Sequence, residues 1–190
     1  MGNNIMPVTI NGTSGLVTAT TFSGSSLTGI DTGKVLQIQT ATKTNTLSET
    51  LAAGAISSSD ISGLTVSITP SNASNKILLL CTLTMSSYDN GFLFYKDGSV
   101  ISGATGDADG TKKRIFAEQY LGSGYTMFSS TFQYVDTAGG TSAITYGPRV
   151  KNTGSASRIH YVNVNHQGRS AISSPDLVGA STFTAMEIST

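Results

Sequence analysis

The chain has 190 residues, and its 11 basic and 11 acidic side chains give a formal net charge of zero at neutral pH. Charged residues make up 12% of the sequence, about half the usual share, and 27 serines and 27 threonines supply most of its polarity. This composition excludes the high net charge of a disordered chain and the positive excess that nucleic acid requires of a protein partner.

The first 33 residues differ from the rest of the chain. Asp31 is their only charged residue, and Gly, Ser and Thr separate two short apolar pieces, Val8–Ile10 and Leu16–Phe22. Neither piece is long enough to bury a face on its own. We therefore predict that residues 1–33 form an extended arm that needs a partner in order to become ordered.

From residue 34 to residue 190 the sequence predicts one strand after another. Alternation of inward and outward side chains is clearest in the run Ile77, Leu79, Cys81, Leu83 and Met85. The predicted strands are Lys34–Thr42, Leu64–Thr69, Lys76–Met85, Phe92–Tyr95, Ser99–Ser102, Arg114–Leu121, Tyr125–Val135, Ala143–Lys151, Arg158–Asn165 and Ser181–Ile188. Antiparallel strands in this number and spacing predict a jelly-roll-like β-sandwich over residues 34–190.

Three connecting stretches carry their own signals. "KDGS" at 96–99 places Asp97 and Gly98 between apolar pieces, which predicts a two-residue hairpin. "TAGGT" at 137–141 predicts a second turn. "TLSETLAAGAI" at 46–56 has leucines four residues apart, and we predict one turn of helix or a loop there.

Few residues in this sequence suggest metal binding or thiol chemistry. His160 and His166 are six residues apart and have no nearby Cys or Glu to complete a metal site. "GDADG" at 106–110 offers Asp107 and Asp109 but lacks the remaining ligands of a calcium loop, so we expect a polar turn. Cys81 is in phase with the apolar run of its strand, which predicts a buried thiol.

The sequence also makes no case for catalysis. Glu118 and Glu187 lie within predicted strands, where we expect them to point outward, and no G-x-S-x-G motif is present. We interpret the basic run 112–114 as the solvated edge of a strand. We expect no enzymatic activity, no cofactor, no metal and no nucleic acid. No apolar run approaches the roughly 18 residues of a membrane span, and "MGNNIMPVTI" has no signal-peptide pattern, so we expect neither membrane insertion nor secretion.

Tyrosines near predicted turns are candidates for glycan contact. "SYDNGFLFY" contains Tyr88, and "LGSGYTMF" contains Tyr125. An exposed ring at a loop tip is enough for weak stacking against a sugar, and we therefore single out these two residues.

Several strings resemble virion structural proteins of tailed bacteriophages, especially phages of aquatic bacteria. They are "INGTSGLVTATTFSG", "GKVLQIQTATKTNT", "GLTVSITPSNASNKILLL", "TSAITY" and the terminal "STFTAMEI". The resemblance covers residues 34–188 well and the arm more loosely. Its motifs are strand-and-turn motifs without catalytic content. It implies a surface protein of the particle, commonly a trimer, of the tail-fibre or head-decoration type.

Together these inferences predict a non-enzymatic structural protein, made in the host bacterial cytoplasm and carried on the virion surface. It would be a homotrimer that serves as a head-decoration (cement) protein or short fibre. The arm would anchor it to neighbouring subunits or other virion proteins by burying Ile10, Leu16, Val17 and Phe22. The alternative is a receptor-binding fibre tip that recognises host surface polysaccharide through Tyr88 and Tyr125.

Overall fold

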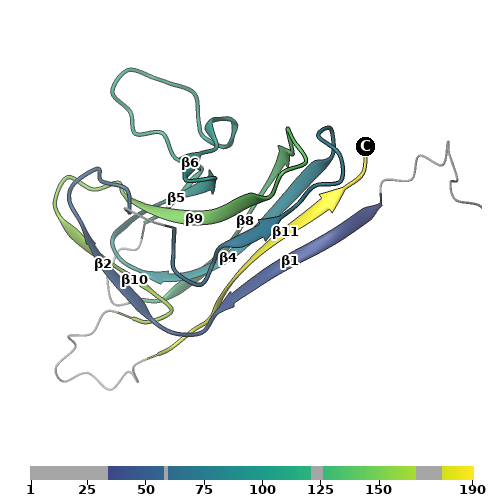
Figure 1. Cartoon of the computed structure of the whole chain (residues 1–190). Helices are drawn as coiled ribbons and strands as arrows, with labels where there is room; N and C mark the ends of the chain where they lie inside the picture. The colour runs from purple at the N-terminus through teal and green to yellow at the C-terminus, as the bar shows by residue number, and fades with distance from the viewer. Residues whose placement is uncertain (1–33, 58–59, 121–125, 166–176) are drawn as a thin grey trace, which may run out of the picture. The chain divides into compact units, whose positions relative to one another are not determined.

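The computed structural model describes residues 34–57, 60–120, 126–165 and 177–190. In these ranges the chain forms eleven β-strands and one short 3₁₀ helix, without any α-helix. The strands belong to two antiparallel sheets that pack against each other (Figure 1). The predicted all-β sandwich is confirmed.

The larger sheet has the order β1–β11–β4–β10–β2, and β8 also pairs with β4. The smaller sheet has the order β3–β9–β5–β6, and β7 also pairs with β5. The elements are β1 (Val35–Lys43), β2 (Leu47–Leu51), β3 (Val66–Ile68), β4 (Lys76–Ser86), β5 (Asp89–Lys96), β6 (Ser99–Val100), the 3₁₀ helix Ser102–Ala104, β7 (Ala117–Tyr120), β8 (Phe128–Thr137), β9 (Ile144–Asn152), β10 (Arg158–Val162) and β11 (Ser181–Ile188).

The pairing of these strands is that of a jelly roll. β1 pairs with β11, β3 with β9, β4 with β8 and β5 with β7, all antiparallel, as in one long hairpin whose two arms lie side by side. The additional pairs β11–β4 and β9–β5 wrap this hairpin into two four-stranded layers, β1–β11–β4–β8 and β3–β9–β5–β7. β2, β6 and β10 extend these layers. The jelly-roll prediction is therefore confirmed at the level of strand order.

The core lies between the two layers. In β4 the predicted inward run is buried, from Ile77 through Leu79 and Cys81 to Met85. The rings of Phe92 in β5 and Phe132 in β8 stack with their centroids 4.2 Å apart, which joins the two sheets directly. Alternation along each strand thus places one set of side chains between the sheets and leaves the other set outside.

Both predicted turns are present. Asp97 and Gly98 have φ angles of 48° and 75°, so both residues adopt the left-handed conformation that a tight β5–β6 hairpin requires. The Thr145 backbone N–H donates to Asp97 Oδ1 at 2.8 Å, which ties this turn to β9. At 137–141 the chain crosses from β8 to β9, and Gly139 has a φ of 75°.

The prediction for residues 46–56 is wrong. Leu47–Leu51 forms strand β2, which pairs with β10, and a turn follows in which Gly54 has a φ of 74°. A spacing of four residues places Leu47 and Leu51 on one face of a helix, but it also places them on one face of a strand. Pairing with β10 decided between the two structures.

Strand boundaries differ from the predicted ones at several further places, of which two change the local structure. The strand predicted as Ser99–Ser102 ends at Val100 and gives way to the 3₁₀ helix. The strand predicted from Arg114 begins at Ala117, so the basic run 112–114 lies in the exposed connection before β7. The prediction for the opening of the domain is close, because β1 begins at Val35.

Candidate assembly face

Strands β1, β11, β4 and β8 lie side by side in one layer (Figure 1), and we call the outward side of this layer the assembly face. Strand register aligns its side chains in rows that cross all four strands. One row is apolar throughout: Ile38, Met186, Leu78 and Val135. Ile38 and Val135, at the two ends of this row, are 54% and 52% exposed, and the two central residues are partly exposed.

The neighbouring rows are made largely of hydroxyl-bearing side chains. The next row consists of Thr40, Thr184, Leu80 and Gln133, and the row after it consists of Thr42, Thr182, Thr82 and Thr131. The hydroxyls of Thr40 and Thr184 lie 3.0 Å apart, and those of Thr82 and Thr131 lie 2.9 Å apart. Cross-strand hydrogen bonds therefore satisfy part of the polarity of these rows within the sheet itself.

The assembly face is almost free of charge. Across the outward positions of the four described strands, Lys76 at one end is the charged residue, and its Nζ donates to Thr137 Oγ1 at 2.8 Å. Four strands about 4.8 Å apart and about 27 Å long cover about 500 Å² before side-chain relief is counted. A stable interface buries about 800 Å² per partner, so this face is of the right order for a protein contact.

Sequence reasoning missed the apolar row. The composition indicated only that serine and threonine supply most of the polarity, and they do so at β3, where Thr65, Ser67 and Thr69 are exposed. The signal that could have found the row is the unbroken apolar run "ILLLC" at 77–81. A strand with apolar residues at consecutive positions presents them on both of its faces.

The predicted arm residues Ile10, Leu16, Val17 and Phe22 and the predicted glycan contact Tyr125 lie outside the described residues. Tyr88 lies just before β5 and is 37% exposed. The guanidinium carbon of Arg158 lies 5.4 Å from the centre of its ring, and Arg158 Nε lies 3.3 Å from Asp89 Oδ2. Tyr88 therefore belongs to a small polar cluster on strands β5 and β10, away from the apolar row.

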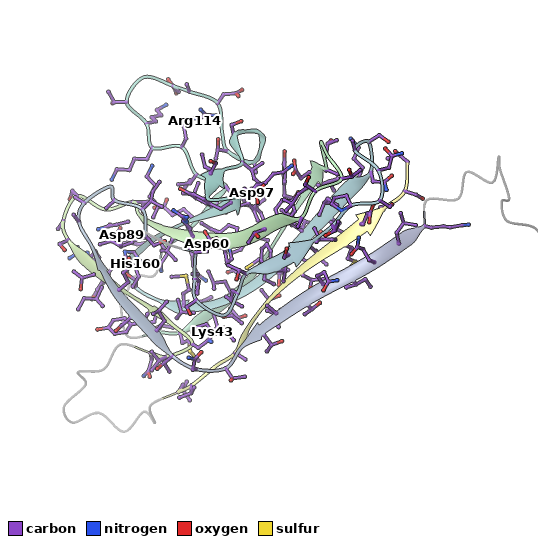
Figure 2. The ribbon with its side chains drawn as sticks, in the orientation of Figure 1. Lys43, Asp60, Asp89, Asp97, Arg114 and His160 are labelled. Atoms are coloured by element: carbon purple, nitrogen blue, oxygen red, sulfur yellow. The ribbon has the colours of Figure 1, made fainter. Side chains whose placement is uncertain are left out.

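His160 is buried in β10 at the same end of the domain as Asp89 (Figure 2). Its Nδ1 lies 2.6 Å from Asn90 Oδ1, and Asn90 Nδ2 donates to the Ser87 carbonyl, so Nδ1 carries the proton and donates. Burial lowers the pKa of His160 to about 4, and the charge of Asp89 opposes part of that shift. A buried imidazole bonded to a neighbouring amide is typical of a structural histidine. His166 lies outside the described residues.

Glu187 does not point outward as predicted. Its carboxylate is buried and accepts hydrogen bonds from Gln37 Nε2 at 2.6 Å, from Asn75 Nδ2 at 2.6 Å, and from the backbone N–H and hydroxyl of Ser71. Burial alone would raise the pKa of this carboxyl, but these hydrogen bonds outweigh it and hold the pKa at about 2. The carboxylate joins β11 to β1 and to the loop before β4. Glu118, by contrast, is exposed as predicted.

The other candidates occupy the positions expected of structural residues. Cys81 is buried, and burial raises the pKa of its thiol. Asp107 and Asp109 are exposed, and Asp109 pairs with Lys112. Within the described ranges no group of three or more His, Cys, Asp or Glu side chains is placed to hold a metal ion. In the same part of the chain no helix has the length and apolar character to cross a membrane.

A shallow hollow of about 340 Å³ lies beside β2 and β10. Its walls are Thr46, Leu47, Ser48, Tyr161 and Val164. The lining residues that the structure describes combine hydroxyls with one aromatic ring, and none of them is charged.

Comparison with known proteins adds no identification. No family model matches this chain, and no curated protein matches it. The geometry of the fold and of the assembly face therefore provides the basis for a proposal about function.

Proposed function

We propose that this chain is a non-enzymatic structural protein on the surface of a tailed-phage virion, and that its copies associate through the assembly face. The observation that carries this proposal is the apolar row Ile38–Met186–Leu78–Val135 on the outside of a four-stranded layer. Exposed apolar surface of this extent commonly marks a protein–protein contact.

The composition of the face favours a second copy of the chain as the partner. A neutral surface meets a copy of itself without charge repulsion and without the cost of desolvating ions. Threonine rows keep such a surface soluble before association, and four of their hydroxyls already have partners within the sheet. A negatively charged partner would find only Lys76 as a complement on the outward positions of the described strands, and a positively charged partner would find none there.

We propose three copies in the assembly, in keeping with the resemblance to trimeric virion proteins. Around a threefold axis, one part of the assembly face of each copy would contact a different part of the next copy's face. The assembly would decorate the head as a cement protein or form a short fibre. Residues 1–33 would attach it to other virion proteins. The chain would be made in the cytoplasm of the host bacterium and would act mechanically, without a cofactor.

Two valines of similar exposure test this proposal. Val135 lies in the apolar row, whereas Val100 lies in β6 of the smaller sheet and is 42% exposed. The wild-type protein should have a solution mass of about three times 19.6 kDa. Val135→Asp should reduce it to one chain mass, because an unpaired carboxylate buried in an apolar contact costs several kcal/mol.

Val100→Asp is the matched control and should leave the wild-type mass unchanged, as measured by analytical ultracentrifugation at micromolar concentration. A wild-type monomer would contradict self-association. Retention of the full mass by Val135→Asp would show that the copies meet through another surface.

A glycan-recognising fibre tip is the second candidate function. The arrangement that favours it is the Tyr88 ring beside Arg158 and Asp89, because sugars are bound by ring stacking together with charged hydrogen-bonding groups. A glycan-binding screen with the wild-type protein and with Tyr88→Ala tests it. Binding that is lost in the variant would favour this function, and an absence of binding would leave the structural role.

A further inference from the structure

β1 lies at an edge of the larger sheet, and only one of its sides is paired. Its register with β11 runs from Val35 opposite Ile188 to Lys43 opposite Ser181, and no strand in the described ranges pairs with its other side. In an antiparallel strand about every second residue directs its N–H and C=O away from the partner. Among the described residues, most of β1 therefore presents backbone donors and acceptors that no strand pairs with, although the Lys43 carbonyl accepts from Asn163 Nδ2.

β1 lacks most of the features that commonly protect the edge of a sheet. Its sequence, VLQIQTATK, has no proline, and its one charged residue, Lys43, is buried with Nζ bonded to Asn45 Oδ1. The irregularity in its register falls near the start, between Val35 and Gln37, so the strand is regular from Ile38 onward. Proteins usually blunt such edges with charges, prolines, bulges or a short strand, since an open edge is a template for another strand.

We propose that this edge binds the segment Leu16–Phe22 of a neighbouring copy, which adds to the sheet as a further strand beside β1. The inference rests on the self-association proposed above, because the added strand comes from a second chain. It gives the 1–33 segment a defined acceptor, and it closes an edge that would otherwise permit open-ended pairing of copies.

The chemistry of the segment matches the edge. "LVTATTF" has seven residues without charge, proline or glycine, and Val, Thr and Phe favour the extended backbone. Seven residues of strand span about 23 Å, which fits within the nine residues of β1. The apolar side chains at the start of β1, Val35 and Leu36, are 53% and 44% exposed and would gain cover from the added strand.

The length of the connection favours a neighbouring copy over the same chain. Lys34 is held at the start of β1, where its N–H donates to Ser189 Oγ and its carbonyl accepts from the Ser189 N–H, both at 3.0 Å. A hairpin of Leu16–Phe22 on its own β1 would need a structureless loop of about a dozen residues, which is uncommon in compact domains. Stretched toward another copy, residues 23–33 reach at most about 40 Å.

Hydrogen–deuterium exchange of the full-length protein tests the proposal. We would compare wild type with Val17→Pro, which removes an N–H donor and interrupts the added strand, and with Thr28→Pro as a matched control outside Leu16–Phe22. In wild type and in the control, nearly all amides of the β1 peptide should exchange slowly. In Val17→Pro about half of them, those not bonded to β11, should exchange roughly 100-fold faster.

The solution mass is measured in parallel and separates this inference from the proposed function. All three proteins should keep the assembled mass, because the assembly face holds the copies together, and dilution of wild type to the monomer should release the same β1 amides. Identical exchange of β1 in wild type and Val17→Pro would overturn the inference, as would protection that persists in the monomer. A monomeric mass at every concentration would overturn the proposed self-association itself.

Discussion

Two buried titratable side chains, His160 and Glu187, differ in their charge state: one is neutral and the other is charged. His160 stays neutral, because its Nε2 has no hydrogen-bond partner in the described structure and a second proton would have no acceptor there. Glu187 stays charged, because four hydrogen bonds from three residues surround its carboxylate. At the residue scale, the available partners rather than the residue type decide which form is buried.

Both groups make the domain less stable in acid. The pKa of His160 is about 4 in the folded domain and near 6.5 in the unfolded chain, so between these values the unfolded chain binds a proton that the domain does not. Its contribution is complete above pH 6.5, and the free energy of unfolding should fall by about 2 kcal/mol between pH 7 and pH 5. For Glu187, with a folded pKa of about 2, the loss occurs from pH 4.5 downward.

Urea denaturation at a series of pH values measures both effects. His160→Gln should abolish most of the slope between pH 6.5 and pH 5, whereas Glu187→Gln should keep that slope and lose the one below pH 4.5. Wild-type stability that does not change between pH 7 and pH 5 would show that His160 is solvated in solution.

Strand β4 presents apolar side chains on both of its faces. It lies between β11 and β8 in its layer, and each of its faces is apolar over part of its length. Leu79 points into the core and is fully buried, while the adjacent Leu78 points to the assembly face and is partly exposed. At the element scale, the two-residue period of a strand separates the core side chains from those of the proposed association surface along a single stretch of chain.

Aspartate at these two adjacent positions should therefore have different effects. Leu79→Asp should prevent folding, because an unpaired charge in the core costs several kcal/mol. Leu78→Asp should leave a folded, dissociated domain with a stability loss of about 1 kcal/mol. Circular dichroism and solution mass distinguish the two results, and equal unfolding by both variants would mean that Leu78 belongs to the core of the single chain.

At the scale of the whole molecule, the jelly roll brings the start of β1 and the end of the chain to the same place. The Ser189 N–H and Oγ bond to the backbone of Lys34, and the Thr190 N–H donates to Asn75 Oδ1. The segment 1–33 thus joins the domain at one end of the assembly face, beside Val35 and Ile188. Association of copies with their faces aligned in one direction would bring these segments together at that end.

Deleting residues 1–33 should leave the domain folded, because the described core lies entirely between residues 34 and 190. Circular dichroism should remain typical of β-structure, while binding to virions that lack this protein should be lost. In the full chain, binding should depend only weakly on salt, since Asp31 is the single charge of the segment and burial must supply the affinity. Undiminished binding by the truncated protein would place the anchor in the domain.

The sequence by itself determined the features that depend on neighbours along the chain. Alternation assigned Ile77, Leu79 and Cys81 to the core, and the Asp97–Gly98 pair predicted the hairpin, because side-chain direction in a strand and left-handed turns are local properties. Even so, local spacing was ambiguous for Leu47 and Leu51, which are four residues apart and share a face in either a helix or a strand.

Only the tertiary structure decided which strands lie side by side and in what register. Ile38, Leu78, Val135 and Met186 are far apart in the sequence, and they form one row because β1, β11, β4 and β8 pair as they do. Alternation indicates which residues of a strand share a face. A shift of register by two residues would keep the same residues on that face, but these four side chains would no longer lie opposite one another. Burial of Glu187 has the same origin, since its partners come from two distant segments, β1 and the loop before β4, that the fold brings to one carboxylate.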